Sequence, residues 1–164
     1  MVQNPSAGAE QNLGLHAVDE EDLAFISAHA QDALIRVKDL AYLPKQRRFA
    51  LICARFDRFA EREGRRERRQ TGLHFDSVIS VRRLQLDLDQ SEQVLALLAV
   101  TFEPIKEASP SGVIRLIFAG GPEIELQVEC IEAQMRDIGP RWRVDAGPQH
   151  NLDVGLDEEP KGRS

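Results

Sequence analysis

The chain is poor in aromatic side chains, with one Trp, one Tyr and seven Phe among 164 residues. Recognition of bases relies on aromatic stacking, so this scarcity weakens a nucleic-acid function. The longest uninterrupted apolar run, Val94–Val100, has seven residues. A membrane-spanning helix needs about 20. The sequence therefore predicts no membrane-embedded segment.

Cysteine is equally scarce, because Cys53 and Cys130 are the two in the chain and each lies in a strongly apolar pattern. Thiols in such surroundings are typical of reduced, buried side chains in a reducing compartment. Residues 1–12 are mostly polar or small and do not resemble a secretory leader. Together these features predict a cytoplasmic location.

Motifs that carry chemistry are also missing. There is no Gly-x-Ser-x-Gly elbow and no glycine-rich phosphate loop. His74 and Asp76 share a strand face, but a surface polar pair is the simpler interpretation because no second ligand pair accompanies them. No pair at zinc-ligand spacing is formed by His16, His29, His74 and His150. The sequence therefore predicts no catalytic residue, no metal site and no cofactor.

What the chain does have is alternation of apolar and polar residues, which indicates strands. The clearest example is a strand pair within residues 111–129, where every second residue is apolar on each side of Gly120-Gly121. Similar patterns predict a hairpin over residues 33–56, an extended stretch over 73–86 and a strand over 94–102. No helical pattern separates these strands, which favours an antiparallel arrangement over alternating parallel β-α-β units.

Two helices are expected, one at each end of this series of strands. Asp19 is a suitable cap for a helix over residues 20–31, whose apolar stripe is Leu23, Ile26 and Ala30. The second helix is expected to end at Gly139-Pro140, and its stripe is Ile131, Met135 and Ile138. A single stripe predicts that this C-terminal helix caps one opening of the core.

The predicted fold class is therefore α+β: an antiparallel six- or seven-stranded sheet, or a partly open barrel, with an N-terminal helix and a C-terminal capping helix. This order of elements resembles the pleckstrin-homology-like (PH-like) barrel over residues 33–139. One domain is expected over residues 13–143. Disordered tails are expected over residues 1–12 and 144–164, which lack an apolar period.

Several short blocks also make the chain similar to an uncharacterised bacterial family, a domain of unknown function found mainly in alphaproteobacteria. The blocks are Asp22-Leu23, Ile26-Ser27-Ala28, Gln31-Asp32-Ala33, Arg47-Arg48-Phe49, Arg55-Phe56, Thr71-Gly72-Leu73-His74-Phe75 and Val128-Glu129-Cys130-Ile131-Glu132-Ala133. The resemblance covers about residues 15–143. It implies no activity, ligand or catalytic residue.

Charge is distributed unevenly along the chain. The net charge is −6, but residues 45–69 contain ten Lys or Arg and four Asp or Glu, which gives this segment a charge of +6. Arginine is well suited to binding carboxylates and phosphates. The candidate partner-binding residues are Arg47, Arg48, Arg62, Arg65, Arg66, Arg68 and Arg69.

Three functions remain open for this segment and for the domain. The leading one is a non-enzymatic protein-binding or scaffold module of the bacterial cytoplasm, which binds a protein or peptide through a strand edge or the Arg-rich loop 58–70. The alternative is an enzyme, or an accessory subunit, with a site in the barrel mouth. The third is nucleic-acid or anionic-ligand binding through the same loop. The negative net charge argues against nucleic acid, and Glu61, Glu63 and Glu67 could equally make the loop a simple solvated connection.

Overall fold

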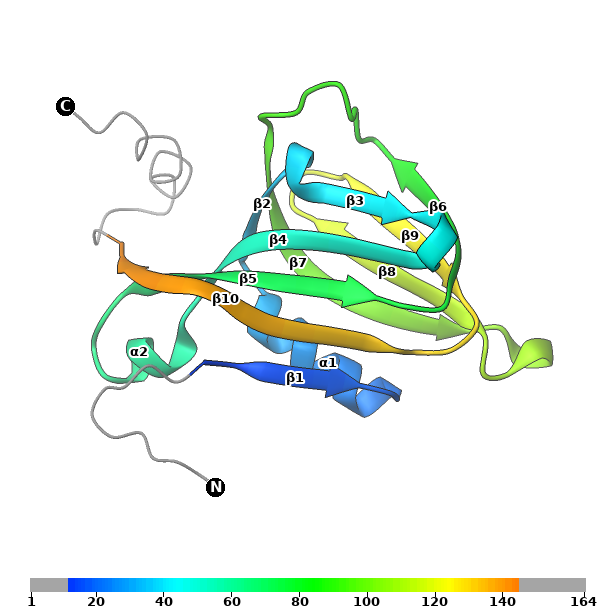
Figure 1. The fold of residues 1–164 in the computed structure, drawn as a ribbon, viewed down its shortest axis with the longest axis horizontal. Coiled ribbons are helices and arrows are strands. Elements are labelled where there is room, and N and C mark those ends of the chain that lie inside the picture. Colours follow the sequence, from blue (N-terminus) through cyan, green and yellow to red (C-terminus); the bar gives the residue numbers. More distant parts are fainter. Residues whose placement is uncertain (1–11, 145–164) are drawn as a thin grey trace.

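The computed structural model describes residues 12–144, which form ten β-strands, two α-helices and short 3-10 turns (Figure 1). The strands are β1 (Gly14–Ala17), β2 (Leu34–Arg36), β3 (Leu40–Leu43), β4 (Arg48–Phe56), β5 (Glu67–Phe75), β6 (Val78–Leu84), β7 (Val94–Pro104), β8 (Gly112–Phe118), β9 (Glu123–Val128) and β10 (Ala133–Arg143). The helices are α1 (Glu20–Ala30) and α2 (Arg58–Arg62).

All strands belong to one antiparallel sheet with the order β1-β10-β5-β4-β2-β7-β8-β9-β6, and β3 pairs with β4. The sheet folds back on itself at β2, which pairs with β4 only at Leu34 and Ala54 and with β7 on its other side. In Figure 1, β4, β5 and β10 consequently lie in front of β7, β8 and β9. No ladder joins β1 to β6 in the described part of the chain, so the sheet is open.

The core lies between these two layers and follows from the two-residue period of the strands. On β8 every second side chain is buried, and Ile114, Leu116 and Phe118 are at most 1% exposed. They belong to the same apolar cluster as Leu73 and Phe75 of β5 in the facing layer. Burying one such side chain stabilises the fold by roughly 1.5–3 kcal/mol.

The predicted N-terminal helix is present as α1. Asp19 caps it by accepting a 2.8 Å hydrogen bond from the N–H of Asp22. The Oγ of Ser27 accepts a 2.9 Å hydrogen bond from the N–H of Val100 on β7, which fixes the helix against that strand. The helix contacts β7, β1 and β4. Its buried residues are those of the expected stripe, Leu23, Ile26 and Ala30.

The predicted C-terminal capping helix is wrong, because these residues form β10, which pairs with β5 and β1. Met135 and Asp137 are buried, whereas Ile138 is 51% exposed. The fold class must be corrected with it, because residues 12–144 are mostly antiparallel sheet with two small helices, and the sheet is open. The PH-like barrel closed by a last helix is therefore not the fold of this chain.

The other strand predictions need smaller corrections. The hairpin is formed by β3 and β4, while β2 precedes it beyond a 3-10 turn and pairs with β4 only at Leu34 and Ala54. The extended stretch divides at Ser77, whose φ of +59° turns the chain from β5 in one layer to β6 in the other. The Arg-rich loop predicted at 58–70 contains α2 and the start of β5, so only residues 63–66 connect them.

The predicted tails, residues 1–12 and 144–164, lie outside the described residues except for Asn12 and Val144. Within residues 12–144, neither helix is long and apolar enough to cross a membrane.

Replacing Gly112 by Ala is expected to lower the free energy of unfolding by about 1–3 kcal/mol, because the new methyl group overpacks a filled site. Its Cβ would overlap the ring of Phe102 and lie 2.6 Å from the carbonyl oxygen of Glu103. Urea denaturation measures the loss. Gly14→Ala is the matched control, since nothing lies within 4 Å of its added Cβ. Equal stability of the two variants would contradict the expectation.

Candidate functional site

The interior of the sheet changes from apolar to charged at one end. The alternation that buries apolar residues on β4, β5 and β10 continues past the core, so the next inward positions are polar. Each of these side chains is at most 7% exposed. They are Arg55 on β4, Asp57 directly after it, Arg69 and Thr71 on β5, and Asp137 on β10. This buried polar cluster is the floor of the candidate site.

Arg55 and Asp137 form its central ion pair. The Nε and Nη2 atoms of Arg55 donate to the two carboxylate oxygens of Asp137, both at 2.9 Å. The same carboxylate accepts from Thr71 Oγ1 at 2.8 Å and from the N–H of Leu13 at 2.7 Å. The pair therefore connects β4, β5 and β10 to the segment that leads into β1.

Arg69 and Asp57 form a second pair beside the first. Arg69 Nε donates to Asp57 Oδ2 at 3.0 Å, and its Nη1 donates to Asn12 Oδ1 at 2.9 Å. The other oxygen of Asp57 accepts from the N–H groups of Phe59 and Ala60, both at 3.0 Å. Asp57 is thus the N-cap of α2, and a buried arginine holds the cap in place.

Arg68 is a third buried guanidinium. Its Nη1 donates to the carbonyl oxygen of Ala54 at 2.7 Å, and its Cζ lies 4.1 Å from the ring centre of Phe56. Burial lowers its pKa to about 10, which still leaves the group charged at neutral pH. In the described part of the chain its Nε and Nη2 atoms have no partner.

Two of the three buried guanidinium groups are paired with carboxylates, and the third is not. Arg55 pairs with Asp137 and Arg69 with Asp57. Arg68 forms no ion pair with a carboxylate among residues 12–144 and has backbone and ring contacts instead. A surplus positive charge in a low-dielectric interior attracts anions to the surface above it.

The two carboxylates are poor candidates for proton donors. Burial alone raises the pKa of Asp137, but the Arg55 hydrogen bonds and the N–H of Leu13 outweigh it, and the pKa lies below its ordinary value. For Asp57, burial likewise raises the pKa, and the N–H of Ala60 and the side chain of Arg69 bring it below its ordinary value. Both groups are therefore ionised at neutral pH.

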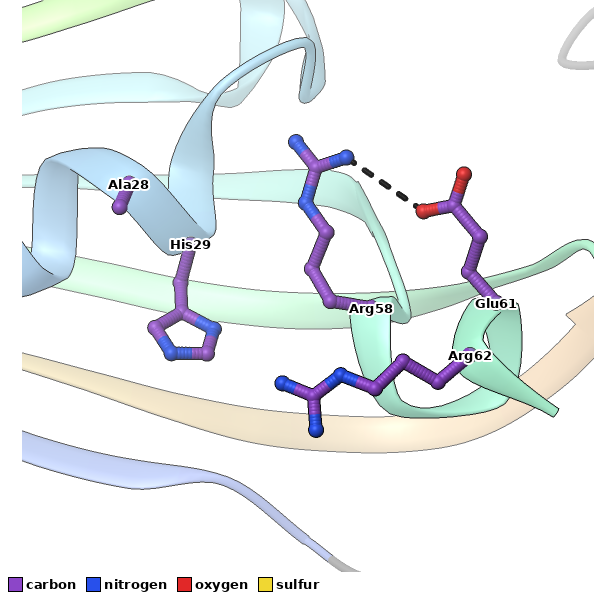
Figure 2. A pocket seen from close by; sticks show the side chains of 5 residues that line it. All are labelled: Ala28, His29, Arg58, Glu61 and Arg62. Carbon is purple, nitrogen blue, oxygen red and sulfur yellow. Dashed lines mark ion pairs between the residues drawn. The ribbon is translucent and has the colours of Figure 1, made fainter.

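A pocket of about 200 Å³ opens on this charged end of the core. A second pocket, of about 430 Å³, shares the residues His29, Arg58 and Arg62 with it and is drawn in Figure 2. The walls of the smaller pocket come from the end of α1, from α2 and from the segment before β1. Its lining residues are Asn12, Leu13, His29, Arg55, Asp57, Arg58, Phe59 and Arg62.

His29, in the last turn of α1, is the one neutral ionisable group of these walls. Burial lowers its pKa, and the positive charges of Arg55 and Arg58 lower it further. Its Nδ1 atom is buried and has no hydrogen-bond partner among residues 12–144. A buried imidazole nitrogen without a partner is costly and can be satisfied by a ligand.

The structure separates the seven candidate arginines. Arg47 pairs with Glu129 at 2.5 Å and Arg48 with Asp76 at 2.7 Å, at the opposite end of β4 from the pocket. Arg65 is held between Glu63 and Glu67, at 2.7 and 2.9 Å.

Two more of the seven, Arg68 and Arg69, are buried as described. The exposed guanidinium groups of Arg62 and Arg66 make no hydrogen bond or ion pair with any described residue. Of the predicted set, Arg62 is the one that lines the pocket.

Among the polar side chains of the buried cluster and the pocket, reasoning from sequence missed Asn12, His29, Arg55, Asp57, Arg58, Thr71 and Asp137. Arg55 and Asp57 continue the period of β4 from Cys53, and that alternation was the available signal. The position of His29 follows from α1, but its proximity to α2 depends on how the sheet folds back, which no local pattern encodes.

Two side chains of nucleophile type, those of Cys53 and Thr71, lie close to Asp137. Cys53 is buried, which raises its pKa to about 12. Residues 12–144 contain no group of three His, Cys, Asp or Glu side chains placed to hold a metal ion. Thr71 donates its hydroxyl hydrogen to an ionised carboxylate that two N–H groups of Arg55 already engage.

Comparison with known proteins places the chain in a family. Neither the curated proteins nor the solved structures contain a match. A family model matches residues 13–150, a range that includes every strand of the sheet and every residue of the pocket except Asn12. The chain therefore belongs to the family described as "Protein of unknown function (DUF2948)".

Proposed function

We propose that this domain is a non-enzymatic binding module that recognises an acidic segment of a partner protein. The observation that carries the proposal is a pair of exposed arginines, Arg62 and Arg66, whose side chains have no partner among residues 12–144. They lie in the segment directly before the buried Arg68, which has no carboxylate partner there either. The partner would contact the cationic surface, defined here as Arg58, Arg62 and Arg66.

The small number of available charges supports a protein partner over nucleic acid. A nucleic-acid-binding protein can neutralise about 6–10 phosphates with Lys and Arg, whereas this surface offers two arginines whose side chains have no partner among residues 12–144. Glu61, Glu63 and Glu67 lie in the same segment and would repel a continuous phosphate backbone. The charges of an acidic peptide lie on separate side chains. These can reach the arginines without lying against Glu61, Glu63 and Glu67.

An enzyme with a site in this pocket is the alternative function. It would need a nucleophile or a group that exchanges protons at neutral pH. The ionised state of Asp57 and Asp137, each held by a guanidinium group, favours binding over this alternative. The bacterial, mainly alphaproteobacterial, and cytoplasmic setting expected from the sequence is part of the proposal.

Reversing the two available charges tests the proposal. The Arg62→Glu, Arg66→Glu double variant should bind a short fluorescein-labelled oligoglutamate peptide at least about tenfold more weakly. Two repulsive contacts replace two attractive ones, each worth roughly 0.5–1 kcal/mol. Fluorescence anisotropy at low salt measures the affinity.

The matched control is Arg83→Glu, Arg136→Glu, which makes the same charge change at exposed arginines of β6 and β10. This control should retain most of the affinity. A single-stranded DNA oligonucleotide of equal charge is titrated in parallel. Equal losses in the two double variants, or tighter binding of DNA than of peptide, would count against an acidic protein partner.

A further inference from the structure

The walls of the smaller pocket bring two unsatisfied side chains together. In Figure 2, His29 from the end of α1 and Arg62 from α2 extend into the same space, while Arg58 extends toward Glu61. Both His29 and Arg62 also line the smaller pocket. The Nδ1 atom of His29 and the guanidinium of Arg62 each lack a partner among the described residues.

Pairing of the remaining charges leaves one positive charge in the walls. Arg55 is engaged by both carboxylate oxygens of Asp137. Arg58 Nη2 donates to the carbonyl oxygen of Gln31 at 3.0 Å, and Arg58 Nη1 lies 3.6 Å from Glu61. The guanidinium of Arg62 is the remaining positive charge. A ligand with a single negative charge would therefore neutralise the walls of the pocket.

The shape of the unused donors also fits one particular anion. A guanidinium group presents a planar pair of N–H donors that matches the two oxygens of a carboxylate. A neutral imidazole with its proton on Nδ1 donates one further hydrogen bond. A phosphate dianion would bring a second negative charge close to Asp57, which also lines the pocket.

The size of the pocket limits what can enter. Pockets for whole small-molecule ligands are commonly about 300–1,000 Å³, and this one is about 200 Å³. By itself it is therefore suited to one side chain or one chain terminus. His29 and Arg62 also line the neighbouring space of about 430 Å³, which can take the rest of the segment that carries the carboxylate.

We propose that this pocket binds a single carboxylate group, whose two oxygens accept hydrogen bonds from Arg62 and one of which also accepts from His29 Nδ1. The inference rests on the proposed function, since the carboxylate would be the anchoring group of the acidic partner. Arg66 then contributes only long-range attraction.

The test is a peptide titration of the full chain that is monitored by NMR, with the signals of the His29 ring and the Arg62 side chain as readouts. The probe is the capped peptide acetyl-Gly-Glu-Gly-amide, and its Gln counterpart is the uncharged control. We expect saturable shifts of both signals with a Kd on the order of millimolar for the Glu peptide, and no shifts for the Gln peptide.

Two substitutions separate the pocket from the general charge of the surface. Arg62→Gln should abolish saturation, whereas Arg66→Gln, which removes the same charge outside the pocket, should leave the Kd within about twofold. His29→Gln, which retains an N–H donor, should weaken binding less than His29→Ala. Equal effects of Arg62→Gln and Arg66→Gln would overturn the pocket proposal.

Additional probes identify the source of the carboxylate and the class of anion. Acetylglycine presents a chain-terminal carboxylate, and inorganic phosphate presents the dianion at equal ionic strength. Tighter binding of phosphate than of both carboxylates would overturn the inference. A different result would reject the carboxylate pocket and still support the proposed function. In that case peptide binding would depend equally on Arg62 and Arg66, and the His29 signal would not saturate. Saturation of the His29 signal without binding of oligoglutamate would support the carboxylate pocket and overturn the proposed acidic protein partner.

Discussion

Asp137→Ala is expected to lower the free energy of unfolding by about 3–5 kcal/mol, since removing one member of a buried ion pair leaves the other charged and unpaired. The exposure of the Arg55 and Asp137 side chains is 4% and 0%. The loss is a large part of the roughly 5–15 kcal/mol that stabilises a typical domain. Thr71 and Leu13 would each lose an acceptor as well.

Urea denaturation measures this change, with Asp137→Asn as a variant that keeps the volume and one acceptor oxygen. The matched control is Glu103→Ala, which removes a carboxylate that pairs with Arg115 at 2.6 Å but is 65% exposed. Exposed pairs contribute about 0–1 kcal/mol. A similar loss in Asp137→Ala and Glu103→Ala would show that the buried cluster does not stabilise the fold.

A double variant distinguishes the interaction between Arg55 and Asp137 from the cost of burying each charged side chain. Arg55→Met, Asp137→Leu should be less destabilised than the sum of the two single replacements, because no unpaired charge remains in it. Additive losses would mean that Arg55 and Asp137 act independently, which the two 2.9 Å hydrogen bonds between them argue against.

The same cluster explains why the sequence misleads about the C-terminal part of the chain. Inward positions of β10 include Ala133, Met135 and Asp137, so the two-residue period is intact. Asp137 makes this two-residue period hard to recognise in the sequence, because a carboxylate is not expected at a core position. Ile138 lies on the opposite face against Gly72 of β5 and adds a false three-residue spacing after Met135.

The N-terminal helix was predictable for the opposite reason, since its signals are local. Asp19 caps the first turn, and the stripe that ends at Ala30 faces the core. The strand pair around Gly120-Gly121 was predictable too, because the φ values of +90° and +113° are those that favour glycine. Signals of this kind need no knowledge of tertiary contacts.

The pocket depends on contacts between distant parts of the chain. Arg55 and Asp137 are 82 positions apart, and Arg69 and Asn12 are 57 apart. A run of arginines in a sequence shows how many positive charges a segment has. Whether each guanidinium is buried, paired or available follows only from the fold, and that decides which one can bind a ligand.

Acid should unfold this protein through the two buried carboxylates. The folded-state pKa values of Asp57 and Asp137 lie below the ordinary value of 3.8. The unfolded chain therefore binds more protons than the folded chain between these values. Their stabilisation is present above the unfolded pKa and is lost as the pH falls through the folded pKa. Each proton contributes a slope of up to about 1.4 kcal/mol per pH unit.

Two histidines add an earlier and separable change. The pKa values of His29 and His74 are lowered from 6.5 in the folded state, in both cases first by burial. The unfolded chain therefore takes up these protons first, and stability already declines as the pH falls below 6.5.

Urea denaturation across the acid range should give two regions of positive slope. Asp137→Asn should reduce the slope of the lower region alone, because it removes one titrating carboxylate and no histidine. An unchanged slope there would mean that protonation of Asp137 does not drive the acid unfolding.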